Sequence, residues 1–289
     1  MTISINQNYV NQFSSNLYLL LEQKGSKLKG LFTEEKANGE KHFFDRLGNF
    51  QVEEITSRLE PVNLQDPAHS RRMATVRKYH ASTYIDNLDQ MRMLIDPSNE
   101  YARKLASKHG NNFDKKLIEA MLGTAATGKD GDGSQAFDTS NQQIVHGSTG
   151  LTSAKIDQAL RIMMDNDVDM NEELFLLVGG MGIEDLLQEA KLTSFDYQPN
   201  KVLGGKSLPM YRGVNIVHVS PQQLPQHTAG SVSRALLVHR DAMKVALNQD
   251  IEIKTAERPD LNFAQQISTY MSFGAVRMDE MLIVDILYQ

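Results

Sequence analysis

The spacing of apolar side chains along the 289-residue chain predicts two amphipathic helices in its first half. Over residues 8–22, and again over 98–121, apolar residues recur every three or four positions on one helical face. Ser98, directly after Asp-Pro, is the expected N-cap of the second helix. Gly110 interrupts that stripe at a cost of about 1 kcal/mol relative to alanine. The pattern therefore fits either one kinked helix or two separate helices.

Between these two helices, apolar and polar residues partly alternate, as they do in β-strands. Residues 43–86 contain two runs rich in β-branched and aromatic residues, joined by the polar stretch 63–72. This arrangement is typical of a long β-hairpin with a solvated tip. The hairpin holds too few core-forming side chains to be a domain by itself.

Beyond residue 150, stretches with the helical spacing of apolar residues alternate with stretches typical of strands. Helices are predicted at 153–164, 183–191 and 240–247, and strands at "LFLLVGG", "RGVNIVHVS" and "RALLVH". The chain ends in two further β segments, "QDIEIKTAE" and "ISTYMSFGAVRMDEMLIVDIL". Mixed helices and strands with a long terminal β region indicate an α+β protein.

Composition narrows the class of protein. The chain has no cysteine, which excludes disulfides and thiolate metal sites. It has no run of about twenty apolar residues and no signal-peptide pattern at its start, so we expect no membrane partner. Residues 1–110 carry 15 basic and 13 acidic side chains, whereas 111–289 carry 15 and 23. The net charge of −6 argues against sequence-specific DNA binding, and the opposite bias of the two regions hints at self-association.

One stretch, "LGTAATGKDGDG", imitates a nucleotide-binding P-loop. Gly123, Gly128 and Lys129 occupy the motif's glycine and lysine positions. A P-loop follows a buried strand, however, whereas this stretch follows a predicted helix. Asp130 stands where a magnesium-binding Ser or Thr is needed. We interpret the stretch as a flexible connector after the helix.

Two other functional motifs are incomplete. After "LFLLV", Gly180 and Gly182 fit a dinucleotide-binding loop, but Asp185 replaces its third glycine. Around Ser148, His146 replaces the first glycine of a nucleophile elbow. A tight strand-to-helix turn and an ordinary loop are the better interpretations.

No metal site is predicted either. "DGDGSQAFD" resembles the start of a calcium loop, but Asn141 occupies the position that requires glutamate. The eight histidines lack metal-binding spacing, and the acidic stretch 165–173 fits a solvated connection better than a cation site. The sequence thus predicts no catalytic, cofactor-binding or metal-binding residue.

The order of elements resembles that of major capsid proteins of tailed bacteriophages, which have the Hong Kong 97-type shell fold. Residues 83–128, including "FDKKLIEAMLGTA", look most like the family. "RGVNIVHVS", "LLVHRDAMKVAL" and "GAVRMDEMLIVDI" resemble its later segments. The resemblance covers nearly the whole chain, although none of these segments is diagnostic alone.

The resemblance implies a Hong Kong 97-like α+β capsid fold with five parts. These are an N-terminal arm (1–45), an extended β-hairpin called the E-loop (46–80), a peripheral domain with a long spine helix (81–140), an axial α/β domain (141–261) and C-terminal strands that return to the peripheral domain (262–289). In this interpretation the connector after the helix lets the axial domain pivot.

The resemblance also implies a function. The chain would assemble as pentamers and hexamers into the icosahedral head shell of a tailed phage, around double-stranded DNA that it contacts non-specifically. It would be a virion protein assembled in the host cytoplasm, with scaffolding, portal and decoration proteins as further partners, and not an enzyme. The alternatives are an encapsulin-like compartment shell, which shares the fold, and a nucleotide-dependent enzyme that uses the loop from Gly123 to Lys129.

Two expectations concern the E-loop and the arm. Some members of the family cross-link subunits through an E-loop lysine, but no lysine lies between His42 and Arg77, so we expect no isopeptide bonds. No long heptad pattern precedes Phe43, so we expect scaffolding, where it is needed, to come from another chain.

A further expectation concerns contacts between subunits. The E-loop region carries a set of arginines that would reach carboxylates and carbonyls of a neighbour's acidic C-terminal part: Arg58, Arg71, Arg72 and Arg77. The alternative is that these arginines only keep the hairpin soluble.

Overall fold

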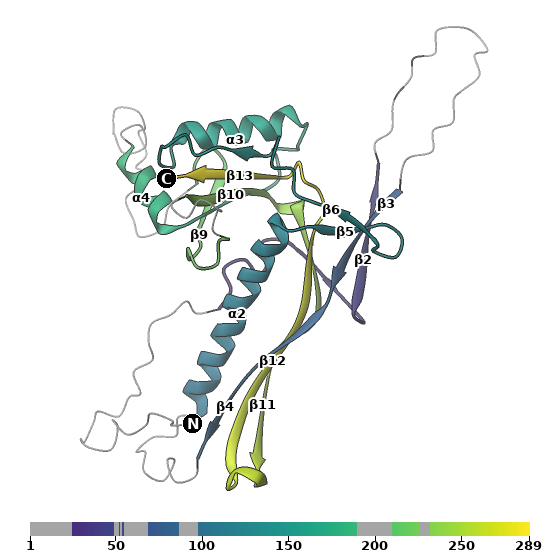
Figure 1. Ribbon diagram of the computed structural model, residues 1–289, viewed down its shortest axis with the longest axis vertical. Helices are drawn as coiled ribbons and strands as arrows, with labels where there is room; N and C mark the ends of the chain where they lie inside the picture. Colours follow the sequence, from purple (N-terminus) through teal and green to yellow (C-terminus); the bar gives the residue numbers. More distant parts are fainter. Residues whose placement is uncertain are drawn as a thin grey trace, which may run out of the picture.

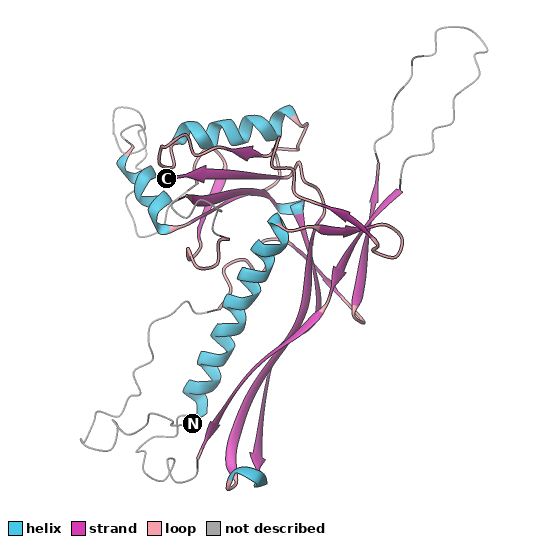
Figure 2. Ribbon diagram, viewed as in Figure 1, coloured by secondary structure: helices cyan, strands magenta, loops and turns pink. Residues whose placement is uncertain are grey.

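The computed structural model describes residues 25–48, 52, 54, 69–86, 98–189, 210–225 and 232–289. Within them the chain forms three sheets and three α-helices, arranged as a compact five-stranded part, a long helix beside a long sheet, and a projecting hairpin stem (Figure 1; Figure 2). The predicted helix over 8–22, most of the predicted hairpin tip and Arg58 lie outside the described residues.

The five-stranded sheet has the order β7 (Gln143–Ile144), β13 (Ile283–Tyr288), β10 (Ser233–His239), β8 (Leu174–Val178) and β9 (Val214–His218). Every residue of β8 is buried, because both faces of the sheet are covered. One face packs on α3 (Ser153–Asp165) and α4 (Gly180–Gln188). The other face packs on the long helix. This explains the uninterrupted apolar run "LFLLV" and confirms the predicted strand.

The long sheet has the order β1 (Thr33–Lys36), β11 (Met243–Arg258), β12 (Ala264–Arg277) and β4 (Arg77–Ile85). The long helix α2 (Ser98–Leu122) lies along one face of it. Phe273 of β12 contacts both Phe113 of α2 and Tyr79 of β4, with ring centroids 4.8 and 4.9 Å apart. The same core continues into the five-stranded sheet, so helix and both sheets form one packed unit.

The third sheet contains the stem of the predicted hairpin. Its order is β2 (Lys41–Leu47), β3 (His69–Thr75), β5 (Ala125–Thr127) and β6 (Gly133–Gln135). β2 and β3 pair antiparallel from Lys41 opposite Thr75 to Leu47 opposite His69. The observed stem therefore begins five residues before the predicted boundary at 46, and β4 already belongs to the long sheet.

Two predictions about the C-terminal half were wrong. The segment 240–247 is not a helix: after one 3-10 turn (Arg240–Ala242) it starts β11, since pairing with β12 buries Met243, Val245 and Ala246. Residues 262–289 do not all lie beside α2. β12 does, but β13 joins the five-stranded sheet, where all six of its residues are buried.

The stretch that imitates a P-loop was also misinterpreted as a flexible connector. Residues 125–127 form β5, which pairs with β3 on one side and with β6 on the other. Gly128 and Gly131 adopt positive φ angles, 92° and 83°, in the turn between β5 and β6. The glycines therefore serve a tight hairpin turn that belongs to the sheet of the hairpin stem.

Gly110 does not break α2, which is a single helix of 25 residues. A Cβ atom at Gly110 would lie 2.5 Å from the carbonyl carbon and 2.8 Å from the Cα of Gly25, and closer still to the amide nitrogen of Ser26. One turn later, the buried Asp114 accepts hydrogen bonds from the amides of Lys27 (3.0 Å) and Leu28 (3.2 Å) and from the Ser26 hydroxyl. The glycine thus makes room for the N-terminal segment, and the aspartate holds it against the helix.

We predict that Gly110→Ala destabilises the folded subunit, although alanine inside a helix is about 1 kcal/mol more favourable than glycine. The added methyl group meets backbone atoms, which cannot rotate away, so the segment at Gly25 has to leave its place. Chemical unfolding of the unassembled subunit measures the effect. Lys115→Ala, at an exposed position of the same helix, is the control and should change stability by less than about 0.5 kcal/mol. An equal or greater stability of Gly110→Ala would contradict this account.

Candidate assembly surface at the root of the hairpin

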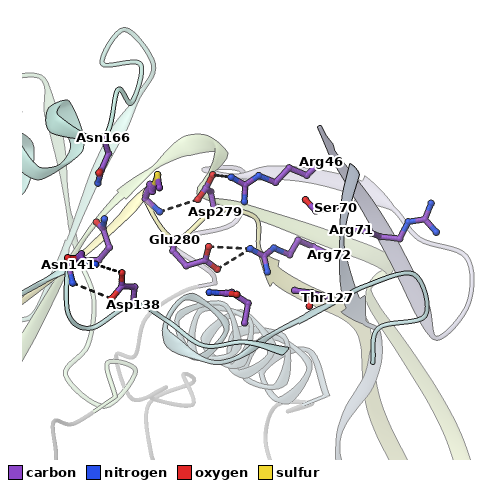
Figure 3. Close-up of a pocket in the computed structure, with 13 residues that line it drawn as sticks. Arg46, Ser70, Arg71, Arg72, Thr127, Asp138, Asn141, Asn166, Asp279 and Glu280 are labelled. Carbon is purple, nitrogen blue, oxygen red and sulfur yellow. Dashed lines mark hydrogen bonds and ion pairs between the residues drawn. The ribbon is translucent and has the colours of Figure 1, made fainter. Parts of the chain in front are cut away.

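A polar groove of about 590 Å³ lies at the root of the hairpin stem (Figure 3). The stem lines one side of it, and the loop after β6 and the turn between β12 and β13 line the other. Arg46 and Arg72 point from the stem toward Asp279 and Glu280 of that turn. The groove thus marks where the projecting hairpin is attached to the body of the subunit.

Two arginine–carboxylate pairs make the attachment. Arg46 pairs with Asp279, and Arg72 donates to both carboxylate oxygens of Glu280, at 3.1 and 3.2 Å. Nε of Arg72 also donates to the Met278 carbonyl at 3.2 Å. Arg72 is only 6% exposed, so this pair is shielded from water and its geometry is well defined.

A third arginine lies beneath these pairs. The guanidinium of Arg277 is fully buried and donates to three carbonyl oxygens, those of Met121 (2.7 Å), Gly123 (2.6 Å) and Gln135 (3.0 Å). Met121 and Gly123 lie at the C-terminal end of α2, where carbonyls lack partners within the helix. Burial lowers the pKa of Arg277, and the adjacent Glu280, 3.3 Å from its Nε, opposes that shift. Glu280 therefore serves two arginines, one from the stem and one at the helix end.

The structure separates the arginines that the sequence placed together. Arg72 faces the groove and is occupied within the subunit. Arg71 points away from it, 2.6 Å from Asp45 and over the ring of Phe43 (Figure 3). Arg77 is exposed on β4, away from the groove. Contacts of Arg58, Arg71 and Arg77 with a neighbour stay a prediction.

Sequence reasoning missed the residues that hold the stem in place, namely Arg46, Arg277, Asp279 and Glu280. Only one signal pointed to them. Arg277 ends an otherwise apolar and small-residue run, "MSFGAVR", and an acid follows three residues later. A charge that closes a buried strand needs a partner, and Glu280 is the partner.

The described residues contain neither a metal ligand set nor a helix that could span a membrane. In this part of the chain no three His, Asp or Glu side chains converge as a metal ligand set would. Among the described helices none has the length and apolar character needed to cross a bilayer.

Comparison with known proteins identifies the family. The model of a family described as phage capsid protein matches residues 5–289, almost the entire chain. The chain belongs to this family. This capsid protein matches none of the curated proteins significantly.

Solved phage capsids have the same fold as this capsid protein. The capsid of cyanophage P-SCSP1u matches with a TM-score of 0.74 and 13% identity, over 100% of this chain and 95% of that one. The capsid of cyanophage Pam1 matches with a TM-score of 0.74 and 14% identity, over 99% and 98%. The capsid of Helicobacter pylori bacteriophage KHP30 matches with a TM-score of 0.71 and 10% identity, over 100% and 98%. The capsid fold predicted from the sequence is confirmed, and the protein is a major capsid protein of a bacteriophage shell.

We predict that Arg72→Met destabilises the capsid subunit by about 3 kcal/mol, because removing one partner of a buried ion pair leaves the other charge uncompensated. Arg71→Met, at the next position of the same strand, should cost about 0–1 kcal/mol, since its pair with Asp45 is exposed. Denaturant unfolding of the two unassembled variants measures the difference. Equal losses would show that the groove pair does not fix the stem.

Proposed function

We propose that this capsid protein assembles, as pentamers and hexamers, into the closed icosahedral head shell of a tailed phage and encloses its double-stranded DNA. The observation that carries the proposal is the extent of the fold match. The whole of this chain aligns with nearly the whole of a phage capsid subunit. This match to a shell subunit favours a structural role over an enzymatic one.

The packaged DNA is contained rather than read. In a subunit with a net charge of −6 the acidic side chains outnumber the basic ones, so its attraction to DNA is weak and fades with salt. The shell forms in the host cytoplasm, and scaffolding, portal and decoration proteins take part as separate chains. The protein itself then resides in the virion capsid.

The exposed arginines of the hairpin region supply part of the contact between subunits. Arg71 is 40% exposed and Arg77 is also exposed, so each can reach a neighbour without giving up a buried bond. Arginine suits such contacts because its planar fork makes two parallel hydrogen bonds to a carboxylate. One exposed pair contributes only about 0–1 kcal/mol, so the effect depends on its repetition around every subunit.

The first test is assembly itself. We expect the protein, expressed together with the products of its neighbouring structural genes, to yield closed particles of uniform size in negative-stain microscopy. On denaturing gels these particles should run as a single 32.4 kDa band, because the E-loop region lacks the lysine for isopeptide bonds. Protein that stays monomeric under all these conditions would refute the shell function, and a covalent ladder would refute only the absence of cross-links.

The second test concerns the arginines. We predict that Arg71→Glu together with Arg77→Glu leaves the subunit folded but reduces particle yield at least several-fold in sedimentation assays. Arg72 stays unchanged, because its loss would also affect folding. The matched control, Lys129→Glu with Arg161→Glu, makes the same change of charge at exposed positions elsewhere. A normal yield of particles from the first pair would show that these arginines only keep the hairpin soluble.

A further inference from the structure

A slot of about 370 Å³ lies between α2 and the outer edge of β4. Four consecutive residues of β4, 78–81, line it from the sheet, and Lys108, His109 and Asn112 line it from the helix. Successive side chains of a strand point to opposite faces, so four consecutive residues can line one cavity only along the edge of the strand. The slot therefore follows a row of main-chain N–H and C=O groups.

This edge of β4 has no other strand beside it in the described part of the chain. β4 is the last strand of the long sheet, and β12 pairs with all nine of its residues on the other side (Figure 1). An open edge can take a further strand, because its main-chain donors and acceptors match those of another extended chain. With α2 as its second wall, the edge has the geometry of a groove for an extended peptide.

Hydrogen bonds fix the two walls of the slot relative to each other. His109 of α2 is 4% exposed, and its Nε2 lies 3.1 Å from the carbonyl oxygen of Thr269 and 3.0 Å from its hydroxyl. The Thr269 hydroxyl in turn donates to the carbonyl of Ala81 on β4, at 3.2 Å. These contacts join α2, β12 and β4. A chain that enters the slot thus meets a preformed site, which lowers the entropic cost of binding.

The residues that line the slot favour a negatively charged occupant. Lys78, His80 and Lys108 can all carry a positive charge there, and the described lining residues include no Asp or Glu. β11, on the other side of the same sheet, differs. Beyond its pairing with β1 it carries Asp250 and Glu252, and its register is interrupted twice. Charge and regular geometry therefore both favour the edge of β4 for an acidic strand.

We propose that the slot binds an extended acidic segment of another protein chain, which pairs with β4 as a fifth strand of the long sheet. Lys78 and His80 are exposed on one face of the sheet, whereas Tyr79 and Ala81 are half-buried on the other. A bound strand alternates in the same way. Its Asp or Glu residues lie beside Lys78 and His80, and its small or β-branched residues lie on the face that α2 covers. The segment therefore alternates acidic and uncharged residues.

Peptide binding to the unassembled subunit tests this site, and the result does not depend on whether shells form. The probe is a fluorescein-labelled peptide, Thr-Glu-Val-Glu-Val-Glu-Thr, and fluorescence anisotropy measures its binding. We expect saturable binding that weakens as salt is added. A peptide with Lys in place of each Glu should bind at least tenfold more weakly. No saturable binding of the acidic peptide, or equal binding of the basic one, would overturn the proposal.

Methylated peptides distinguish strand pairing from attraction between charges. Two versions of the acidic peptide carry N-methyl groups on alternate amides, in the two possible phases. Successive amides of a strand point to opposite edges, so one version loses its donors to β4 and the other keeps them. The first should bind at least tenfold more weakly than the second. Equal binding of the two versions would contradict pairing with β4.

Charge reversal locates the site on the sheet. Lys78→Glu should lower the affinity for the acidic peptide at least tenfold. The subunit should unfold at nearly the same temperature, because Lys78 is exposed and its contact with the Tyr270 ring, at 4.7 Å, lies at the surface. Lys254→Glu is the matched control: it makes the same change at a 61% exposed position of β11 and should bind like wild type. Equal losses in both variants would place the peptide elsewhere and overturn the proposal. If Lys78→Glu instead changes the association of subunits without peptide in sedimentation, a second copy occupies the edge and the proposal is wrong.

Discussion

The buried guanidinium of Arg277 is the constraint on which the arrangement of the three sheets depends. A charged group without exposure has to find a partner for each of its donors, or it costs several kcal/mol. Arg277 finds them on three different elements: the end of α2, strand β6, and Glu280 of the turn that follows its own strand. None of these elements can move alone without leaving part of a buried charge unsatisfied. The helix, the hairpin stem and the long sheet therefore keep fixed positions relative to one another.

The turn at Asp279 and Glu280 connects two sheets and also fixes the orientation of the hairpin stem. It leads the chain out of the long sheet into β13, which lies between β7 and β10 in the five-stranded sheet. Its two carboxylates also bind the arginines of the hairpin stem, so the hairpin leaves the body at a fixed angle. A shell requires subunits whose projecting parts reach the same place on every neighbour. In this subunit the same short turn connects the sheets and orients the hairpin.

The sequence predicted those elements whose patterns are local, and it missed those decided by pairing. The local pattern predicted the helical stretch 98–121 and the strand "LFLLV", although it left open whether Gly110 divides the helix. The segment 240–247 failed because "MKVAL" contains good helix formers, and only pairing with β12 makes it a strand. The place of β13 was predicted wrongly for a related reason, since an apolar segment does not show which sheet it joins. The groove could not be predicted, because the sequence shows which residues are charged but not which of them pair. Glu280, for example, lies 208 residues from Arg72 along the chain.

Arg71 and Arg72 are adjacent in the sequence, but one lies at the surface and the other is buried in an ion pair that fixes the stem. Successive side chains of a β-strand point to opposite faces, so two adjacent arginines on β3 cannot share a role. Arg72 faces inward and fixes the stem, and its loss would damage the subunit itself. Arg71 faces outward, where one ion pair contributes little to folding and stays available to another molecule. Of these two adjacent arginines, one thus holds the subunit together and the other stays on the surface, where it can reach another molecule.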